Sequence, residues 1–364
     1  SDPEYNDAIY AIGLHYPSDY PADNYDGCHK LEKPFWSSEE SSSYADNNGA
    51  ACWARVISSH FVLSGMTSSI MWNLVGSYTH GTNWYNSALF GADQAWSGYY
   101  ERDDSAPVVW ATAHYTHFTE PGWTYLPVGQ GSGELGAGGF YNALISPDKR
   151  DFTLIITNIS RDHAECTRPR LPGFDTDQVQ LHVRLPQSAR DKPLHQWRSN
   201  FERDDGQYFE YLGPANVDSN GLFIVMVEVG DVWTVSTIDT AQKGTFDTPL
   251  PKSNTQFPLP YQDDFEGYRD SREARYFTDQ IGTFEIHSET IDTGGTLPSK
   301  TNHFMRQMVP TLPVGWMGNG ANARGPVSII GTSEMNDISL SAKFRIPSQE
   351  YFSSGAISGC IGGR

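Results

Sequence analysis

Long apolar runs and basic residues are both scarce in this sequence. No segment holds the roughly 18 uninterrupted apolar residues that a membrane-spanning helix needs, and the best apolar run, from Leu222 to Val227, stops at Glu228. Lys and Arg together number 25 against 44 Asp and Glu, which gives a net charge of −19. A surface of that charge repels phosphate backbones. The sequence therefore predicts neither a transmembrane segment nor a nucleic-acid partner.

Cysteine is also rare, with 4 residues in 364. The spacing of Cys28, Cys52, Cys166 and Cys360 matches no zinc-binding pattern, so they are either buried thiols or a sparse set of disulfides. The sequon that begins at Asn158 fits a secretory route and predicts a glycan there. The first residues lack a methionine and the apolar core of a signal peptide, and we expect any targeting peptide to lie outside this sequence.

Aromatic residues, in contrast, are abundant at 13% of the chain, with 10 Trp and 19 Tyr. A flat ring can cover the apolar face of a sugar while its polar edge still hydrogen-bonds, so this composition fits carbohydrate binding. At 364 residues the chain is too long for a single core, and we expect two or three domains.

Residues 1–123 alternate strand-like and helix-like segments. We predict strands over residues 8–16, 35–39 and 67–75. We predict helices over residues 48–64 and 107–118. This order implies parallel strands joined by helical crossovers. In an α/β barrel such strands carry their working residues at their carboxyl ends. Three units are part of the eight in a (β/α)8 TIM barrel, and we expect the other units to precede residue 1.

Three predicted strand ends present His15, Glu39 and Trp72 in succession. Glu39 lies in the string KPFWSSEE, residues 33–40, where an aromatic strand runs into a serine-rich loop. Taken alone, this glutamate reads as an ordinary surface residue at a strand end. The convergence of three strand ends favours a catalytic carboxylate instead.

From residue 124 the apolar pattern changes to a period of two. Residues 124–244 read as a β-sandwich, with regular alternation over residues 179–185. Residues 245–260 form a Pro-rich linker without a hydrophobic period. Residues 261–364 read as a further β domain that is incomplete, in which residues 338–346 alternate as a strand does.

Several short strings in this chain have a specific order and spacing, although each alone is weak. They are HYP at 15–17, WSSE at 36–39, CW at 52–53, TSSIMWN at 67–73, WSG at 96–98, EPGW at 120–123 and CTRP at 166–169. Together they resemble the galactosylceramidases (galactocerebrosidases), a family of retaining β-galactosidases. The resemblance runs from about residue 8 to the end and weakens in the last hundred residues. It implies a barrel, a β-sandwich and a lectin-like β domain in that order.

The resemblance implies that Glu39 is the catalytic nucleophile. Retaining glycosidases need two carboxyl groups about 5 to 5.5 Å apart, and the acid/base of this family is the glutamate of an Asn-Glu pair on an earlier barrel strand. No Asn-Glu pair occurs in this chain, so the resemblance implies a truncated sequence that lacks half of its catalytic pair. Glu40 is a poor substitute because adjacent strand residues point to opposite faces.

The resemblance also implies a set of substrate contacts. They are His15 and Ser42 around the nucleophile, Trp72 and Trp84 in the pocket wall with Tyr85 as a competing choice for Trp84, Arg168 from the sandwich, and Trp316 from the lectin-like domain. Plainer interpretations stay open for four of them: His15 as a core histidine, Trp72 and Trp316 as packing residues, and Arg168 as a surface arginine.

Two structural features follow from the same resemblance. The family pairs the cysteines that correspond to Cys52 and Cys166 in a disulfide, which would hold Arg168 in place and stabilise the fold by on the order of 4 to 5 kcal/mol in the chain-entropy model. Asp264 would ligate a structural Ca²⁺ through its carboxylate, whereas the plainer interpretation is that it opens a strand.

The resemblance therefore implies a fragment of a lysosomal or secreted retaining β-galactosidase that acts on galactosylceramide-type lipids. It implies no redox or organic cofactor, and a lipid-presenting protein partner is a family expectation. One alternative is a related barrel glycosidase with another sugar specificity. Another is a carbohydrate-binding protein that kept the pocket and lost catalysis. The strings around Glu39 and Arg168 disfavour a purely structural β protein, and the fragment alone is expected to be inactive.

Overall fold

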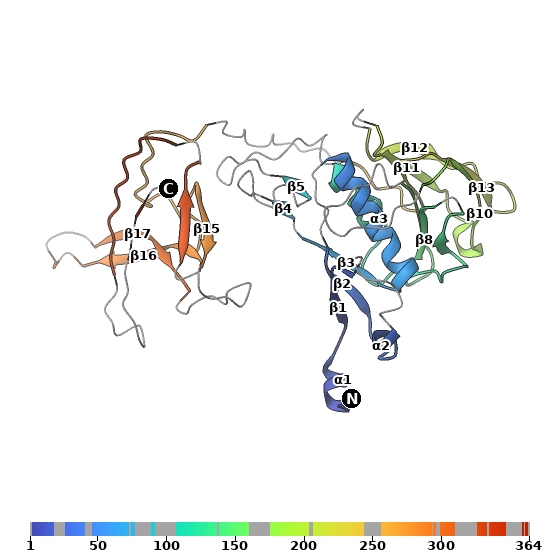
Figure 1. Ribbon diagram of the computed structural model, residues 1–364, viewed down its shortest axis with the longest axis horizontal. Coiled ribbons are helices and arrows are strands. Elements are labelled where there is room, and N and C mark those ends of the chain that lie inside the picture. The colour runs from blue at the N-terminus through green and yellow to red at the C-terminus, as the bar shows by residue number, and fades with distance from the viewer. Residues whose placement is uncertain are drawn as a thin grey trace. The chain divides into compact units, whose positions relative to one another are not determined.

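The chain divides into two compact units in the computed structural model (Figure 1). Unit 1 comprises Ser1–Asp93 and Tyr100–Leu250, and unit 2 comprises Gln94–Tyr99 and Pro251–Arg364. The structure describes residues 2–17, 26–40, 46–72, 74–76, 89–91, 107–136, 138–159, 175–203, 207–243, 256–292, 294–295, 299–309, 326–332, 335–346, 359 and 361–362.

Unit 1 begins with three parallel strands. The sheet has the order β1-β2-β3, with bounds β1 (Ile12–His15), β2 (Phe35–Glu40) and β3 (Ser68–Met71). Both strand pairs are parallel, as the alternation of strands and helices predicts. The helices of this part are α1 (Pro3–Ala8), α2 (Asp26–His29), α3 (Asn47–Ser64) and α4 (Pro107–Thr116).

The first predicted strand begins too early. Residues 3–8 form α1, because Pro3 occupies the first helical turn and the Asp2 side chain accepts hydrogen bonds from the backbone N–H of Glu4 and Tyr5. Only Ile12–His15 pair with β2. The helix thus takes Ala8 from the predicted strand, and residues 9–11 belong to neither element.

Helix α3 agrees closely with its prediction. Asp46 caps its start by accepting a hydrogen bond from the backbone N–H of Gly49, and Gly65 ends it in the left-handed conformation at φ 67°. Trp53 and Ile57, four residues apart, are both buried. Burial extends over every residue from Gly49 to His60, so α3 is covered on all sides.

The second part of unit 1 is an antiparallel sheet of seven strands. They are β6 (Thr124–Tyr125), β7 (Ser132–Glu134), β8 (Phe140–Ile145), β9 (Phe152–Asn158), β11 (His195–Asn200), β12 (Glu210–Pro214) and β14 (Asp231–Ser236). Their order is β12-β11-β14-β9-β8-β6, and β7 pairs with β8. β10 (Val179–Arg184) and β13 (Leu222–Val227) form a separate antiparallel pair.

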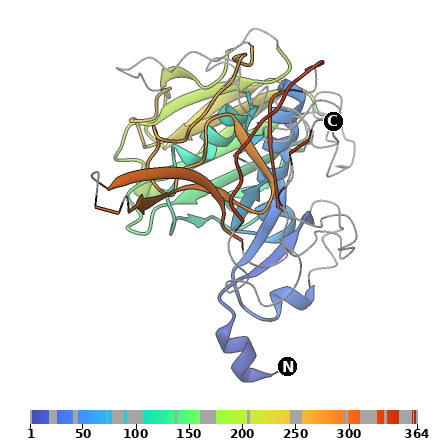
Figure 2. The same cartoon turned by 90° about the vertical axis from the view of Figure 1, so that its left-hand side faces the viewer.

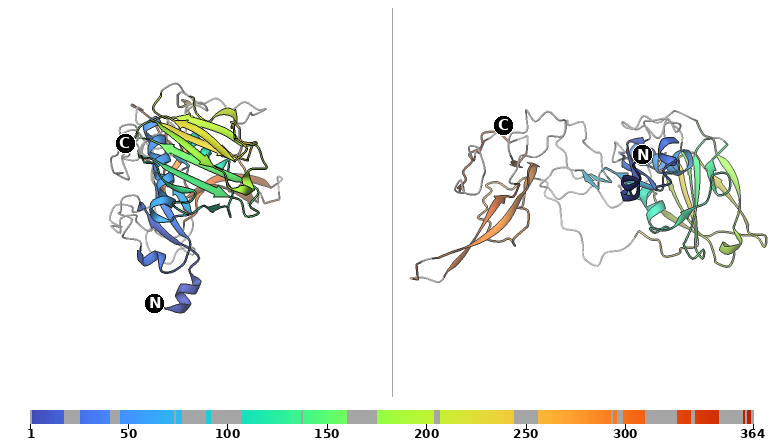
Figure 3. Two further views of the ribbon diagram at one scale, coloured as in Figure 1. Left: turned by 90° about the vertical axis from the view of Figure 1, so that its right-hand side faces the viewer. Right: turned by 90° about the horizontal axis from the view of Figure 1, so that it is seen from below.

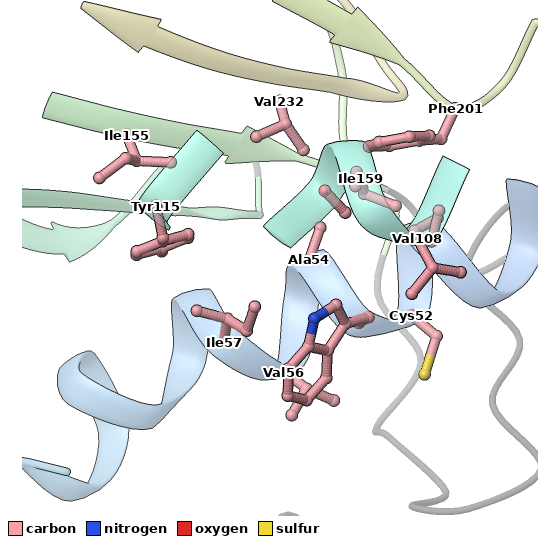
Figure 4. Packing of buried hydrophobic residues seen from close by; sticks show 14 of the residues in the cluster. Cys52, Ala54, Val56, Ile57, Val108, Tyr115, Ile155, Ile159, Phe201 and Val232 are labelled. Atoms are coloured by element: carbon pink, nitrogen blue, oxygen red, sulfur yellow. The ribbon is translucent and has the colours of Figure 1, made fainter. Parts of the chain in front are cut away.

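The seven-stranded sheet is the middle layer of three. On one face, Ile155 and Val232 pack with Ala54 and Ile57 of α3 and with residues of α4 (Figure 4). On the other face, neighbouring residues such as Leu154 pack against the β10–β13 pair. The left panel of Figure 3 shows α3 in blue beside the green and yellow strands. β9 is consequently buried along its whole length, unlike a strand with one face in solvent.

Two short strands complete unit 1, β4 (Val75–Gly76) and β5 (Phe90–Gly91), which pair in parallel. Unit 2 contains two antiparallel pairs. One joins β15 (Phe277–Ile281) to β18 (Val327–Ile330), and the other joins β16 (Phe284–Ile291) to β17 (Lys300–Gln307), the long orange arrows of Figure 2.

The strand-like alternation predicted over residues 338–346 is wrong. These residues belong to no strand, and Leu340, Phe344 and Ile346 are all exposed. An alternating pattern becomes a strand only where a neighbouring strand accepts its backbone hydrogen bonds, and the described residues of unit 2 provide no such neighbour. Within the described ranges, no helix is long and apolar enough to cross a membrane.

Candidate active site

The carboxyl ends of β1, β2 and β3 meet at one edge of the parallel sheet. His15 lies opposite Glu39 in the strand register. The backbone N–H of Tyr16 donates to the Glu39 carbonyl at 2.9 Å, and the backbone N–H of Trp72 donates to the Glu40 carbonyl at 2.6 Å. The structure therefore brings together the three strand ends that the sequence predicts.

Two side chains hold the Glu39 carboxylate, one from the last residue of β1 and one from the residue directly after β1. The His15 Nε2 lies 3.1 Å from one carboxylate oxygen, Oε2. The Tyr16 hydroxyl donates to the other oxygen, Oε1, at 2.9 Å. A carboxylate oxygen has two lone-pair directions, so each oxygen keeps one free for another contact. The Glu39 side chain is 27% exposed, which leaves it accessible to a ligand.

A β-bulge in β2 sets the direction of this carboxylate. The register shifts between Leu14 and His15 on the β1 side, where Ser37 pairs with Leu14 and Glu39 with His15. On the β3 side it shifts between Ser37 and Glu40. Bulges re-aim side chains and are common beside active sites.

A glycine in β1 accommodates the bulge. A Cβ on Gly13 would lie 2.9 Å from the Ser38 Cβ, closer than real Cβ atoms approach. Ser38 is the residue that the register shift inserts, so any larger residue at position 13 would push the bulge away from β1. Position 13 requires glycine because the backbone of β1 lies close to Ser38, and not because of an unusual φ.

Tyr16 is the site residue that the sequence interpretation missed. It is 3% exposed and adopts φ 53°, a left-handed conformation that is uncommon for a bulky residue. Such conformations persist where surrounding contacts hold them, and they cluster at functional sites. The string HYP already contained this tyrosine next to His15, but nothing in the sequence indicated that its hydroxyl reaches Glu39.

Most of the other predicted contact residues lie outside the described residues. These are Ser42, Trp84, Tyr85, Arg168 and Trp316. Trp72 is described and half-buried directly after β3. Their roles as substrate contacts stay predictions.

Cys52 is fully buried in α3 and is disulfide-bonded. Cys166, the partner that the resemblance implies, lies outside the described residues, so the pairing itself stays a prediction. Of the remaining cysteines, Cys360 is also outside them, and Cys28 lies in the short helix α2.

The structure argues against a glycan on Asn158. This side chain is 0% exposed at the end of β9. Its Nδ2 donates to the backbone carbonyls of Asp177 at 3.0 Å and Glu228 at 3.1 Å, and its Oδ1 accepts from the Thr176 hydroxyl. An amide that is enclosed and bonded in this way has no room for a sugar in the folded chain. The sequence contains the sequon, but in the fold its asparagine hydrogen-bonds to neighbouring segments of the chain.

Asp264 is exposed, and its Oδ1 accepts a hydrogen bond from the backbone N–H of Glu266 at 3.1 Å. The neighbouring Asp263 accepts from the hydroxyls of Tyr261 at 2.8 Å and Tyr268 at 2.6 Å. Over the described part of the chain, no group of three or more His, Cys, Asp or Glu side chains could hold a metal ion. The Ca²⁺ prediction for Asp264 thus rests on the resemblance alone.

Three family models match this chain, and all belong to the glycoside hydrolase class. Glycosyl hydrolase family 59 matches residues 1–117, its central domain matches residues 127–242, and the galactocerebrosidase C-terminal lectin domain matches residues 279–358. The chain belongs to glycosyl hydrolase family 59.

Curated relatives agree with these matches. A protein of Danio rerio named galactocerebrosidase is 37% identical over 344 residues, which cover 93% of this chain and 49% of that protein. The human protein of the same name is 33% identical over 344 residues, covering 93% and 47%. The chain thus spans about half the length of the curated relatives it matches.

Among solved structures, a family 30 subfamily 8 xylanase from Clostridium acetobutylicum is similar with a TM-score of 0.43 and 14% identity. The similarity covers 65% of this chain and 50% of the xylanase. It is too weak to support a conclusion about this protein.

Proposed function

We propose that the full-length protein that carries this chain is a retaining β-galactosidase acting on galactosylceramide-type lipids. The observation that carries the proposal is Glu39, a partly exposed carboxylate at the end of a parallel strand with both oxygens held in place. Family membership and the name galactocerebrosidase of the relatives support the choice of galactose and of a ceramide lipid.

In the proposed mechanism, Glu39 attacks the anomeric carbon and the bond to the lipid oxygen breaks. A second carboxyl group, from a segment outside this sequence, donates a proton to that oxygen. The same group then removes a proton from water, which attacks the anomeric carbon and releases galactose and free Glu39. Both steps are substitutions at carbon, so the reaction requires no redox or organic cofactor.

His15 and Tyr16 have defined roles in this mechanism. They hold the Glu39 carboxylate in one orientation, so that the attacking oxygen loses little rotational freedom on the way to the transition state. Their hydrogen bonds also stabilise the carboxylate that is regenerated when water releases galactose. As an ester, Glu39 retains weaker bonds to both donors.

The finer features follow from the same proposal. The β1–β3 sheet and its helices form the C-terminal part of a TIM barrel, and residues 279–358 form part of a lectin-like domain. Ser42, Trp72, Trp84, Arg168 and Trp316 contact the sugar. The proposed location is the lysosome or the secretory route, and the proposed partner is a lipid-presenting protein.

A substrate panel tests the proposed function. The full-length protein is assayed on matched aryl β-galactoside, β-glucoside and β-xyloside, and kcat/KM is compared. The proposal predicts the highest value for the galactoside, with retention of the β configuration in the first product seen by NMR. A preference for the glucoside or xyloside would assign the site to another sugar. Galactoside binding without turnover would indicate a carbohydrate-binding protein.

A further inference from the structure

A buried polar chain lies on the side of the parallel sheet away from Glu39. Glu40, the last residue of β2, is 0% exposed, and its Oε1 lies 3.3 Å from the Nε2 of His60 in α3. The other ring nitrogen of His60, Nδ1, lies 2.6 Å from the Ser69 hydroxyl in β3. Three side chains thus connect β2, α3 and β3.

The bulge determines which of the two glutamates enters this chain. Phe35 and Ser37 of β2 are buried, and regular alternation would place Glu39 with them. Instead the buried residue is Glu40, whereas Ser38 is exposed and Glu39 is partly exposed. The register shift between Ser37 and Glu40 accounts for the change. A regular strand would exchange the positions of the two carboxylates.

Burying Glu40 has a cost that the surrounding fold must offset. A carboxyl group without solvent is stable only where other groups bond to it, and removing one partner of such a pair is strongly destabilising. His60 is one of the groups that offset this cost, so it stabilises the register that buries Glu40. A buried polar contact of this kind is well suited to specify one register among alternatives.

We propose that Glu40, His60 and Ser69 form a positioning network that holds the β2 bulge in the register that turns Glu39 toward His15 and Tyr16. None of the three touches the substrate. The proposal rests on the proposed function of Glu39. It assigns His60, a residue of the crossover helix, a role in the covalent step.

The test measures the rate at which Glu39 becomes covalently labelled. The full-length protein and its variants are incubated with 2-deoxy-2-fluoro-β-galactosyl fluoride. Mass spectrometry then yields the first-order labelling rate constant, the inhibitor dissociation constant and the final fraction of labelled protein. A general loss of folded protein lowers the labelled fraction. A misplaced nucleophile lowers the rate constant, which is the readout that distinguishes positioning from a purely structural role.

The critical variants replace His60. His60→Leu removes both contacts, and we expect the labelling rate constant to fall by about 30- to 100-fold, the range for a nucleophile displaced by about 1 Å. The labelled fraction should fall only by the share of protein that unfolds, and the inhibitor dissociation constant of the folded protein should change less than about threefold. His60→Gln can still donate to Glu40, and we expect it to recover to within about fivefold of the wild-type rate.

His114→Leu is the matched control. His114 is an equally buried histidine with two side-chain partners, but it lies in α4 against the seven-stranded sheet. We expect it to lower stability and leave the labelling rate constant unchanged. If His60→Leu yields too little folded protein, Ser69→Ala replaces it in the test. This variant removes only the hydroxyl that contacts His60, and we expect the labelling rate constant to fall about threefold.

Each outcome separates the two proposals. Absence of a label on wild-type Glu39 would overturn the proposed function. Labelled wild type together with wild-type rate constants in His60→Leu, or in Ser69→Ala where that variant replaces it, would overturn the positioning network. So would a His60→Leu variant that loses labelled fraction at an unchanged rate constant, because His60 would then be only structural.

Discussion

The parallel sheet and the seven-stranded sheet each bury one histidine beneath a helix, and the two histidines have different partners. His60 contacts the Glu40 carboxyl group and the Ser69 hydroxyl. The ring nitrogens of His114 bond two hydroxyls, those of Thr234 and Ser199, each at 2.8 Å. Burial, with a smaller effect of His117, lowers the pKa of His114 from 6.5 to about 3. His60 therefore has a carboxyl group as a partner beside the candidate site, whereas the two side chains that bond the His114 ring are neutral.

Neutral hydroxyl and amide groups also link α3 to the face of the sheet that α3 and α4 cover. The Ser58 hydroxyl of α3 lies 2.6 Å from the Thr157 hydroxyl of β9, and Asn142 donates to the Ser58 carbonyl at 2.9 Å. Burial raises the pKa of Tyr115 to about 12, so its hydroxyl also remains neutral. We call the parallel sheet with the candidate site the first region, and the seven-stranded sheet with α3 and α4 the second region. Changes in the first region should affect catalysis, and changes in the second should affect stability.

The largest expected effect comes from the first region. The variant Glu39→Ala lacks the nucleophile. We expect its kcat/KM to fall on the order of 10⁴-fold while its urea midpoint stays nearly unchanged. Azide should restore turnover of an activated galactoside and yield α-galactosyl azide, because it attacks from the face that Glu39 occupied. A β-galactosyl azide product would instead make Glu39 the acid/base.

The pH dependence of stability tests the second region. As pH falls below 6.5 the unfolded chain protonates His114, whereas the folded chain does so only near pH 3. The unfolding free energy attributable to this group therefore falls with pH, by about 2 to 3 kcal/mol between pH 6.5 and 4.5. Urea unfolding of the wild type and His114→Asn at both pH values measures it. An identical pH slope in both proteins would contradict the assignment.

Asn158, at the end of the interior strand β9, offers a further test of stability in the larger sheet. Asn158→Gln places a longer amide in an enclosed site, and we expect a loss of about 2 kcal/mol of unfolding free energy. Ser160→Ala destroys the same sequon without changing Asn158, so we expect no change in stability or in intact mass. A mass loss of a glycan in Ser160→Ala would show that Asn158 is modified and that the burial is not maintained.

The smallest expected effect is that of Tyr16, which belongs to the first region. Tyr16→Phe removes one hydrogen bond to a charged oxygen, and we expect kcat/KM to fall about 5- to 20-fold. The thermal midpoint should shift little, because the ring and its packing are kept. A large loss of stability with unchanged kcat per folded molecule would show that Tyr16 stabilises the fold and does not assist catalysis.

Local signals predicted much of this fold. Apolar residues four apart and the stop at Gly65 predicted α3 to within one residue at its start, whereas the Asp46 cap was seen only in the structure. The aromatic string before Glu39 predicted β2, and the order of strands and helices predicted a parallel sheet. These features depend on residues close together in the chain, which a sequence displays directly.

The features that the sequence did not reveal depend on contacts between distant segments. The bulge in β2 becomes visible only when both neighbouring strands are aligned, so Glu40 and His60 could not be paired beforehand. The burial of Asn158 depends on Thr176 and Asp177, which cover it from a separate segment. Residues 338–346 have the alternation of a strand, but the described residues place no strand beside them.

The most direct test is to find where the covalent intermediate forms. The full-length protein is incubated with 2-deoxy-2-fluoro-β-galactosyl fluoride and digested, and the modified residue is identified by tandem mass spectrometry. A single fluorogalactosyl ester on Glu39 is the predicted result. An ester on Glu40 or on any other residue would contradict the account of the site.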